Sequence, residues 1–490
     1  MKEIVDRLSK GAWYTLISIL IIKLFTVINS MVTARLLGPS DFGIYSILLS
    51  LQGVLLLFAS FGYPTVVTKF IAESNVRNSY EMDKIYLTSF FSLLILALII
   101  ALLFLFFADF IAIKIYHEKA LKPLIQLVCG VVMLMTLISL NNSVLQGLHK
   151  IKLLSKLNIL NSILYVLLMY VLISNFGLIG APIAGIIVSS FFLLITLIIA
   201  LKLLNLKFSD LRLAWDKEFV KKIFKLSFPL FLSSLTVLFA LWVAKTYLAQ
   251  TAGMKQVGFY QIAESLNYVV GYIPLAVSVP FLPLVSEIEA LGSSKLPLIT
   301  SNILKYSTMI VLPIALTIGL LGKFIILILF GKPYQEAWEI TYILSMGTFL
   351  MSFGILIGAV LNGTGRMWQG LALNCIWMIL FLPLSYVLIY KLGLDGLGYS
   401  YVLSHFLYTI IVLAYATKKL GIKLEGFKSL FALAISFFLI GNVIVRKYDG
   451  INLIMISGLA ILILISLEYL LLRQEEKRFI FSLLSRTYHS

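Results

Sequence analysis

Long apolar segments alternate with short polar segments along almost the whole chain. A membrane-spanning helix needs about 20 consecutive, mostly apolar residues, and about fourteen segments of the sequence meet this requirement. The predicted spans are residues 12–34, 42–64, 86–108, 121–145, 152–173, 179–201, 226–249, 257–283, 303–322, 337–361, 367–390, 396–417, 427–445 and 451–472. The pattern predicts an all-α polytopic membrane protein, because helices satisfy their own backbone hydrogen bonds within the bilayer.

Two stretches of the sequence recur about 215 positions apart. The stretch "ARLLGPSDFGIY" (34–45) corresponds to "AQTAGMKQVGFY" (249–260), and "YVLISNFGLIG" (170–180) shares seven of eleven residues with "YVLIYKLGLDG" (386–396). The matched residues of the first pair are Ala34 with Ala249, Gly38 with Gly253, Gly43 with Gly258 and Tyr45 with Tyr260. A third match aligns Gly147, Lys150 and Asn158 with Gly363, Arg366 and Asn374. Matches at almost the same offset, 215 or 216 positions, predict a duplicated unit.

Each copy of the duplicated unit contains six predicted spans. Because six is even, both copies enter the membrane in the same orientation, which gives a parallel repeat about an axis along the membrane normal. The predicted organisation is an N-terminal six-helix lobe 1–201, a basic linker 202–225, a C-terminal six-helix lobe 226–417, an additional helix pair 427–472 and a tail 473–490. Basic and aromatic residues alternate over 211–228, which predicts an amphipathic helix on the membrane surface.

Composition and charge support a membrane protein and set its orientation. Of the 490 residues, 61% are hydrophobic and 12% are charged, against about 25% charged residues in soluble proteins. Most of the 39 Lys and Arg residues lie in the segments on the same side as the N-terminus. The positive-inside rule therefore places both termini in the cytoplasm. This bias accounts for the net charge of +17 without nucleic acid, and membrane lipid is the expected surrounding.

Lys23 lies near the middle of the predicted span 12–34. The nearer end of the span is roughly 16 Å away, too far for a lysine side chain to reach the headgroups. A charge at this depth costs at least about 2.5–3.5 kcal/mol. Thr26, Ser30 and Thr33 follow on the same helix face. The stripe predicts a cationic site in a wet cavity; a structural pair with a neighbouring helix is the alternative.

A second lysine, Lys245, lies about one turn from the end of the predicted span 226–249. Glu264 has a similar depth in the next span, so an ion pair between the two is one interpretation and a shared cavity the other. The span 257–283 carries polar and small residues at helical spacing, which are Tyr260, Glu264, Asn267, Gly271, Pro274 and Ser278. They predict a cavity-lining helix, or helix packing through small residues. Hinge candidates are Pro274, Pro280 and Pro283.

The chemistry that the sequence lacks narrows the class of protein. The first six predicted spans carry no carboxylate well inside the membrane, and a basic cavity prefers an anionic substrate. Cys129 and Cys375 lie in different apolar segments and form no metal-ligand cluster. The phosphate-binding motif G-x-x-x-x-G-K-[ST] does not occur. A transporter without catalytic residues, cofactor or metal is therefore predicted, with Lys23, Thr26, Ser30, Lys245, Glu264 and Asn267 as cavity candidates.

Three stretches resemble the polysaccharide transporter branch, the Wzx-type O-antigen flippases, of the multidrug/oligosaccharidyl-lipid/polysaccharide (MOP) flippase superfamily. They are "TARLLGPSDFGIYSI" (33–47), "VLQGLHKIKLLSKLNILNSIL" (144–164) and "VLNGTGRMWQGLALNCI" (360–376). The resemblance implies two six-helix lobes around a central V-shaped cavity that opens alternately to each side. It also implies that the first two helices of each lobe line the cavity and present Lys23, Lys245 and Glu264 to it.

The resemblance also implies the cargo, an oligosaccharide carried on a polyprenyl phosphate or diphosphate. Glycosyltransferases of glycan assembly are expected as further partners. A helix pair after the two lobes also occurs in the related lipid II flippases. The alternative function is a cation-coupled antiporter of small amphipathic molecules. Multidrug antiporters of this superfamily often carry an acidic residue in the first helix, and the span 12–34 has none.

Overall fold

The protein is described by a computed structural model, and the statements below refer to part of the chain. The described residues are 2–77, 82–204, 206, 216–290, 295–423, 427–447 and 450–470. Contacts between residues divide the chain into two compact units. The first unit comprises Met1–Gln261 and Met367–Ser400, and the second comprises Ile262–Arg366 and Tyr401–Ser490. This division follows contacts rather than the sequence repeat, so the predicted lobe boundaries stay a prediction.

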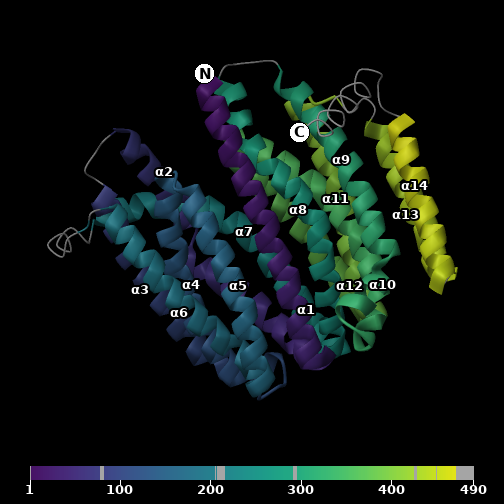
Figure 1. Ribbon diagram of the computed structural model, residues 1–490, viewed down its shortest axis with the longest axis horizontal. Helices are drawn as coiled ribbons and strands as arrows, with labels where there is room; N and C mark the ends of the chain where they lie inside the picture. Colours follow the sequence, from purple (N-terminus) through teal and green to yellow (C-terminus); the bar gives the residue numbers. More distant parts are fainter. Residues whose placement is uncertain are drawn as a thin grey trace, which may run out of the picture. The chain divides into compact units, whose positions relative to one another are not determined.

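Helices make up all the regular structure of the described residues (Figure 1). The first unit contains α1 (Lys2–Ser60), α2 (Tyr63–Arg77), α3 (Met82–Asp109), the π-helical turn η1 (Phe110–Ile115), α4 (Leu121–Gly147), α5 (Ile151–Phe176), η2 (Gly177–Ile179), α6 (Gly180–Leu203) and α7 (Lys217–Ala252). The second contains α9 (Leu296–Leu320), α10 (Gly322–Leu329), η4 (Lys332–Ala337), α11 (Trp338–Gly363), α13 (Phe427–Lys447) and α14 (Gly450–Leu470). Two helices, α8 (Met254–Ala290) and α12 (Met367–Leu420), belong partly to each unit.

Nine helical stretches in the described part of the chain are long and apolar enough to cross a membrane. The stretch in α1 contains a break at Gly38, and the stretch Met367–Leu420 contains a break at Gly393. Another stretch, Ile151–Leu203, includes both α5 and α6. The protein is therefore a multi-pass membrane protein, as predicted, whereas the number of fourteen spans stays a prediction.

In the first unit, α4 packs against α1, α2, α3, α5 and α6 (Figure 1). Its buried Asn141 accepts a hydrogen bond from the Tyr86 hydroxyl of α3 at 2.8 Å. The Asn141 amide in turn donates to the Thr196 hydroxyl of α6 at 3.1 Å. Because a buried polar group without a partner is costly, this chain of hydrogen bonds fixes three apolar helices relative to one another.

The duplicated segments adopt matching backbone conformations at two pairs of equivalent positions, as expected for a repeat. Gly38 and Gly253 have φ/ψ angles of 76°/172° and 87°/166°. At the start of α5 and α12, Lys150 and Arg366 have angles of −82°/42° and −87°/42°. Both glycine positions have positive φ, a conformation that side chains disfavour. The recurrence of glycine in the sequence is thus explained by the turn that each copy makes.

The two copies of the first repeated motif also pack directly on each other within the first unit. A Cβ atom added to Gly43 would lie 1.8 Å from the Met254 carbonyl oxygen, and one added to Gly258 would lie 2.2 Å from the Pro39 carbonyl oxygen. The contact is reciprocal, since each glycine meets the backbone of the other copy. Glycine permits this approach because it has no side chain.

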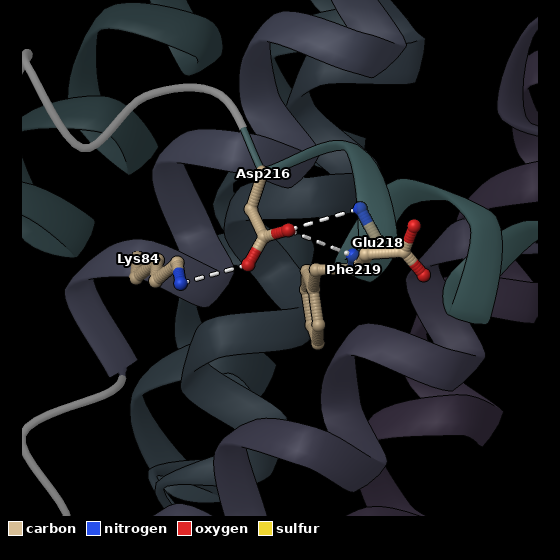
Figure 2. Close-up of polar contacts among 4 residues, drawn as sticks. All are labelled: Lys84, Asp216, Glu218 and Phe219. Atoms are coloured by element: carbon tan, nitrogen blue, oxygen red, sulfur yellow. Dashed lines mark hydrogen bonds and ion pairs between the residues drawn. The ribbon is translucent and has the colours of Figure 1, made fainter.

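The first turn of α7 is fixed by Asp216, as Figure 2 shows. One carboxylate oxygen of Asp216 accepts hydrogen bonds from the backbone N–H groups of Glu218 and Phe219, at 3.0 and 3.1 Å. The other oxygen lies 2.7 Å from the Lys84 ammonium of α3. The Phe219 ring packs against Phe70 of α2. Residues from Lys217 onward, which the sequence assigned to the linker and to a surface helix, therefore form the beginning of α7. Residues 205 and 207–215 of the predicted linker lie outside the described residues.

The helix pair α13–α14 packs on α9 in the second unit. The Tyr342 hydroxyl of α11 donates a hydrogen bond to the Phe438 carbonyl of α13. The Phe438 ring also contacts the rings of Tyr342 and Phe349. The additional helix pair is thus attached through an aromatic contact to α11, while the predicted tail 473–490 lies outside the described residues.

Candidate functional site

Lys245 lies on α7 in the first unit, and 5% of its surface is exposed. Its ammonium donates a hydrogen bond to the Gln261 side-chain oxygen of α8 at 3.2 Å. The same oxygen accepts a hydrogen bond of 2.5 Å from the Ser46 hydroxyl of α1. The Tyr260 ring centroid lies 5.4 Å from the ammonium, within the range of a cation–π interaction. A buried cation is therefore held among polar and aromatic groups from three helices.

The sequence repeat relates the members of this site to one another. Applying the offset of 215 positions, Gln261 corresponds to Ser46, and Lys245 corresponds to Ser30. The hydrogen bond between Ser46 and Gln261 thus joins equivalent positions of the two copies. Only one of the two copies has a lysine, so the site is symmetric in its backbone and asymmetric in its charge.

The predicted stripe on the first part of α1 varies in exposure along its length. Lys23 is half-buried, and Thr26 is exposed and donates its hydroxyl to the Ile22 carbonyl at 3.0 Å. Ser30 is buried, and Thr33 is fully buried. The accessible end of the stripe is therefore the end that carries the lysine.

Glu264 lies one helical turn after Gln261 along α8, and the contacts described for it are in the second unit. The Tyr268 hydroxyl donates a hydrogen bond to the Glu264 carboxylate. The side chains of Tyr272 and Tyr401 are near enough to interact with its charge. The carboxylate is thus placed in a group of tyrosines. The ion pair predicted between Lys245 and Glu264 stays a prediction.

Asn267, the last candidate, is buried in α8. Its amide donates hydrogen bonds to the carbonyl oxygens of Ala263, at 2.9 Å, and Thr341, at 3.1 Å. Both acceptors are backbone groups, and the second belongs to α11. This residue therefore joins two helices of the second unit, which is a structural role; its place in a cavity stays a prediction.

Sequence reasoning missed polar residues of the lysine site and others that contact Tyr45, the neighbour of Ser46 in the sequence. Gln261 and Ser46 are absent from the predicted set, as are Asn29 and Tyr165, whose side chains hydrogen-bond to the Tyr45 hydroxyl. The repeat contained the signal for two of them, because positions related by the offset meet in space. No His, Cys, Asp or Glu cluster suited to a metal occurs among the described residues.

Solved structures of transporters share this fold. The lipid II flippase MurJ in an inward closed conformation superposes with a TM-score of 0.75 at 15% identity, covering 93% of this chain and 98% of its own. An inward-facing multidrug resistance transporter of the MATE family gives a TM-score of 0.70 at 17% identity, covering 82% and 94%. The chain therefore has the fold of the MOP superfamily of transporters.

The chain belongs to the polysaccharide biosynthesis protein family, whose model matches residues 8–289. Relatives include an uncharacterized membrane protein of Methanocaldococcus jannaschii, 22% identical over 93% of this chain and 96% of the relative. A putative O-antigen transporter of Shigella flexneri is 24% identical over 75% of this chain and 88% of its own. A probable low-salt glycan biosynthesis flippase of Haloferax volcanii is 23% identical over 80% of each.

Proposed function

We propose that the protein is a flippase that moves an oligosaccharide linked to a polyprenyl phosphate or diphosphate across the cytoplasmic membrane. Membership of the polysaccharide biosynthesis family is the observation that carries the proposal. The names of the O-antigen transporter and the glycan biosynthesis flippase support the same class of cargo. Glycosyltransferases that assemble the glycan are the proposed partners.

The lysines supply the charge that the phosphate needs. Lys23 lies at the accessible end of its stripe, and Lys245 is buried beside the repeated motif. A cation in a medium of low dielectric constant attracts an anion more strongly than it does in water. In this mechanism Lys23 binds the phosphate, the sugar crosses in a wet cavity and the polyprenyl tail stays in the lipid. Alternating access exposes the cavity to each side in turn.

The test of this function is glycan export by Lys23→Ala. A strain that depends on this protein for its surface glycan is complemented with each variant, and surface glycan and protein level are measured together. We expect Lys23→Ala to abolish most export at normal protein level. Lys23→Arg keeps the charge with a different donor geometry and is expected to retain partial export.

The matched control is Leu238→Ala, since Leu238 is the repeat equivalent of Lys23. It shortens a side chain at the same position of the other copy without removing a charge, and is expected to export normally. Normal export by stable Lys23→Ala would contradict the phosphate-binding role. Export of small amphipathic cations by the wild type, without glycan export, would instead identify the antiporter alternative.

A further inference from the structure

A pocket of about 210 Å³ lies in the second unit, apart from the lysine site of α7. It is formed where the end of α8, the start of α9, the end of α11 and the end of α12 come together. Its polar lining residues are Glu289, Thr300, Thr364, Arg366 and Lys419. The apolar part of the lining includes Leu296, Val360 and Ile422. The lining of the pocket thus combines apolar and charged side chains.

Two cations and one carboxylate face this pocket, so its net charge is positive. Arg366 precedes the first turn of α12, and Lys419 lies in the last turn of the same helix. Neither side chain has an acidic partner within ion-pair distance among the residues that the structure describes. The hydroxyls of Thr300 and Thr364 donate to carbonyls of their own helices. Both cations line the pocket, where an anionic ligand can meet them.

The surroundings of the pocket indicate that this ligand belongs to a lipid. Leu298, in the first turn of α9 beside the lining residues Leu296 and Pro297, is 64% exposed. Leu298 belongs to a stretch that is long and apolar enough to span a membrane, so its exposed side chain suits contact with lipid tails, whereas arginine and lysine side chains favour the headgroup level. Cations in the lining next to an exposed apolar side chain suit a molecule with a phosphate headgroup and an acyl or isoprenoid tail.

We propose that this pocket binds the phosphate group of a membrane lipid. Arg366 donates paired hydrogen bonds to the phosphate oxygens, because a guanidinium matches their geometry, and Lys419 adds a second positive charge. Glu289 accepts hydrogen bonds from hydroxyl or amino groups of the headgroup. The site is independent of the proposed cargo site, since no residue is shared with it.

The repeat supplies a matched comparison for this site. Arg366 corresponds to Lys150, which has the same backbone conformation at the start of α5. Lys419, however, corresponds to Leu203 of α6. Only the second copy therefore combines two cations at these positions. The lipid is expected to bind there and not at the equivalent positions of the first copy.

The experiment measures binding of dioctanoyl phosphatidylglycerol to the full-length protein in neutral detergent by native mass spectrometry. We expect Arg366→Gln and Lys419→Ala each to weaken binding at least about fivefold, the loss expected for one charge-assisted hydrogen bond. Arg366→Lys keeps the charge but loses the paired hydrogen bonds, so it should retain only part of the affinity, and Lys150→Ala should bind within about twofold of the wild type. Thermal unfolding of each variant verifies that it is folded.

Two further ligands identify the source of the phosphate. Dioctanoylglycerol has the same tails without a phosphate and is expected not to compete. Inorganic phosphate at equal concentration is also expected not to compete. If it displaced the lipid, the ligand of the pocket would be free phosphate and not a lipid. The proposed site would be wrong if Arg366→Gln and Lys419→Ala both bound the lipid with wild-type affinity. It would also be wrong if Lys150→Ala lost as much affinity as they do.

Discussion

Asp216 shows how one residue at a helix end joins local and tertiary structure. Its carboxylate caps α7 and at the same time pairs with Lys84 of α3. The hydrogen bond from Lys84 is the main cause that lowers the pKa of Asp216 below its ordinary value, and the two backbone N–H groups contribute. A carboxyl whose pKa is lowered by folding stabilises the folded state at pH values above its unfolded pKa. That contribution is lost as the pH falls through the folded pKa.

This linkage predicts a pH-dependent effect of Asp216→Asn. Asparagine can still cap the helix, so the substitution removes mainly the charge. We expect the variant to unfold at a lower temperature than the wild type at pH 7. The difference should shrink as the pH falls below about 4, where aspartate becomes protonated. Thermal unfolding in detergent measures it, with Glu218→Gln as the control for loss of an acid in the same turn. A difference that persists unchanged at the lowest pH would contradict the prediction.

Lys245 marks the limit of what a single sequence reveals about the candidate site. The sequence predicts how deep Lys245 lies in the membrane, because the number of residues between it and the polar end of its span gives that depth. Its contacts with Gln261 and Ser46 depend on how three helices rotate about their axes. Hydropathy does not determine this rotation in a span that is apolar on most sides. The predicted depth of Glu264 matches that of Lys245. The ammonium contacts Gln261, which lies about one helical turn before Glu264 in α8.

At the scale of the element, the repeated turn between the two halves of α1 is matched by the turn between α7 and α8. Gly38 and Gly253 adopt the same unusual conformation. One turn further along each helix, Gly43 and Gly258 allow the two copies to touch. The motif therefore encodes both a turn and a contact, and this double requirement accounts for two glycines five positions apart in each copy.

The contact predicts that alanine at either glycine is destabilising. Gly43→Ala and Gly258→Ala would place a methyl group against a backbone oxygen, which cannot move away as a side chain could. We expect each to lower the free energy of unfolding by about 1–3 kcal/mol or more, measured by thermal or denaturant unfolding in detergent. Gly53→Ala is the control, since Gly53 has open space around its Cβ position and a helical neighbourhood. Equal stability of Gly43→Ala and Gly53→Ala would contradict the close packing.

Among the elements, the long apolar helices were predictable and the short ones were not. The helix α2 (Tyr63–Arg77) has only fifteen residues and several polar positions, so an apolar window assigns it to a loop. It is nevertheless packed against α3 and α4 through Val67 and Ile71, which are fully buried. The helix α10 was missed for a similar reason, because its eight residues are too few for a span.

At the scale of the whole molecule, the distribution of positive charge gives a prediction of orientation. The loop after α4 contains the exposed residue Lys150, and the exposed residue Lys391 lies two residues before the break of α12 at Gly393. The predicted topology places the first in the cytoplasm and the second outside. These two sites are suited to a test because one lies at the start of α5 and the other beside the break within α12.

The test uses a background in which Cys129 and Cys375 are replaced by alanine. Lys391→Cys should react with an impermeant thiol reagent in intact cells, whereas Lys150→Cys should react only after permeabilisation. Each site is the control for the other, since both lysines are exposed. Labelling of Lys150→Cys from outside would reverse the predicted orientation.

The reciprocal contact between Gly43 and Gly258 has a consequence for the origin of the chain. When residue i of one copy meets its equivalent in the other, the interface has the isologous form of a two-fold symmetric dimer. The hydrogen bond between Ser46 and Gln261 obeys the same rule. A single six-helix ancestor could therefore have formed this contact with a second copy of itself before the two genes were fused. Lys245 occupies the position that corresponds to Ser30 in the other copy. A homodimer of identical chains could not have acquired this difference, so it arose after the fusion.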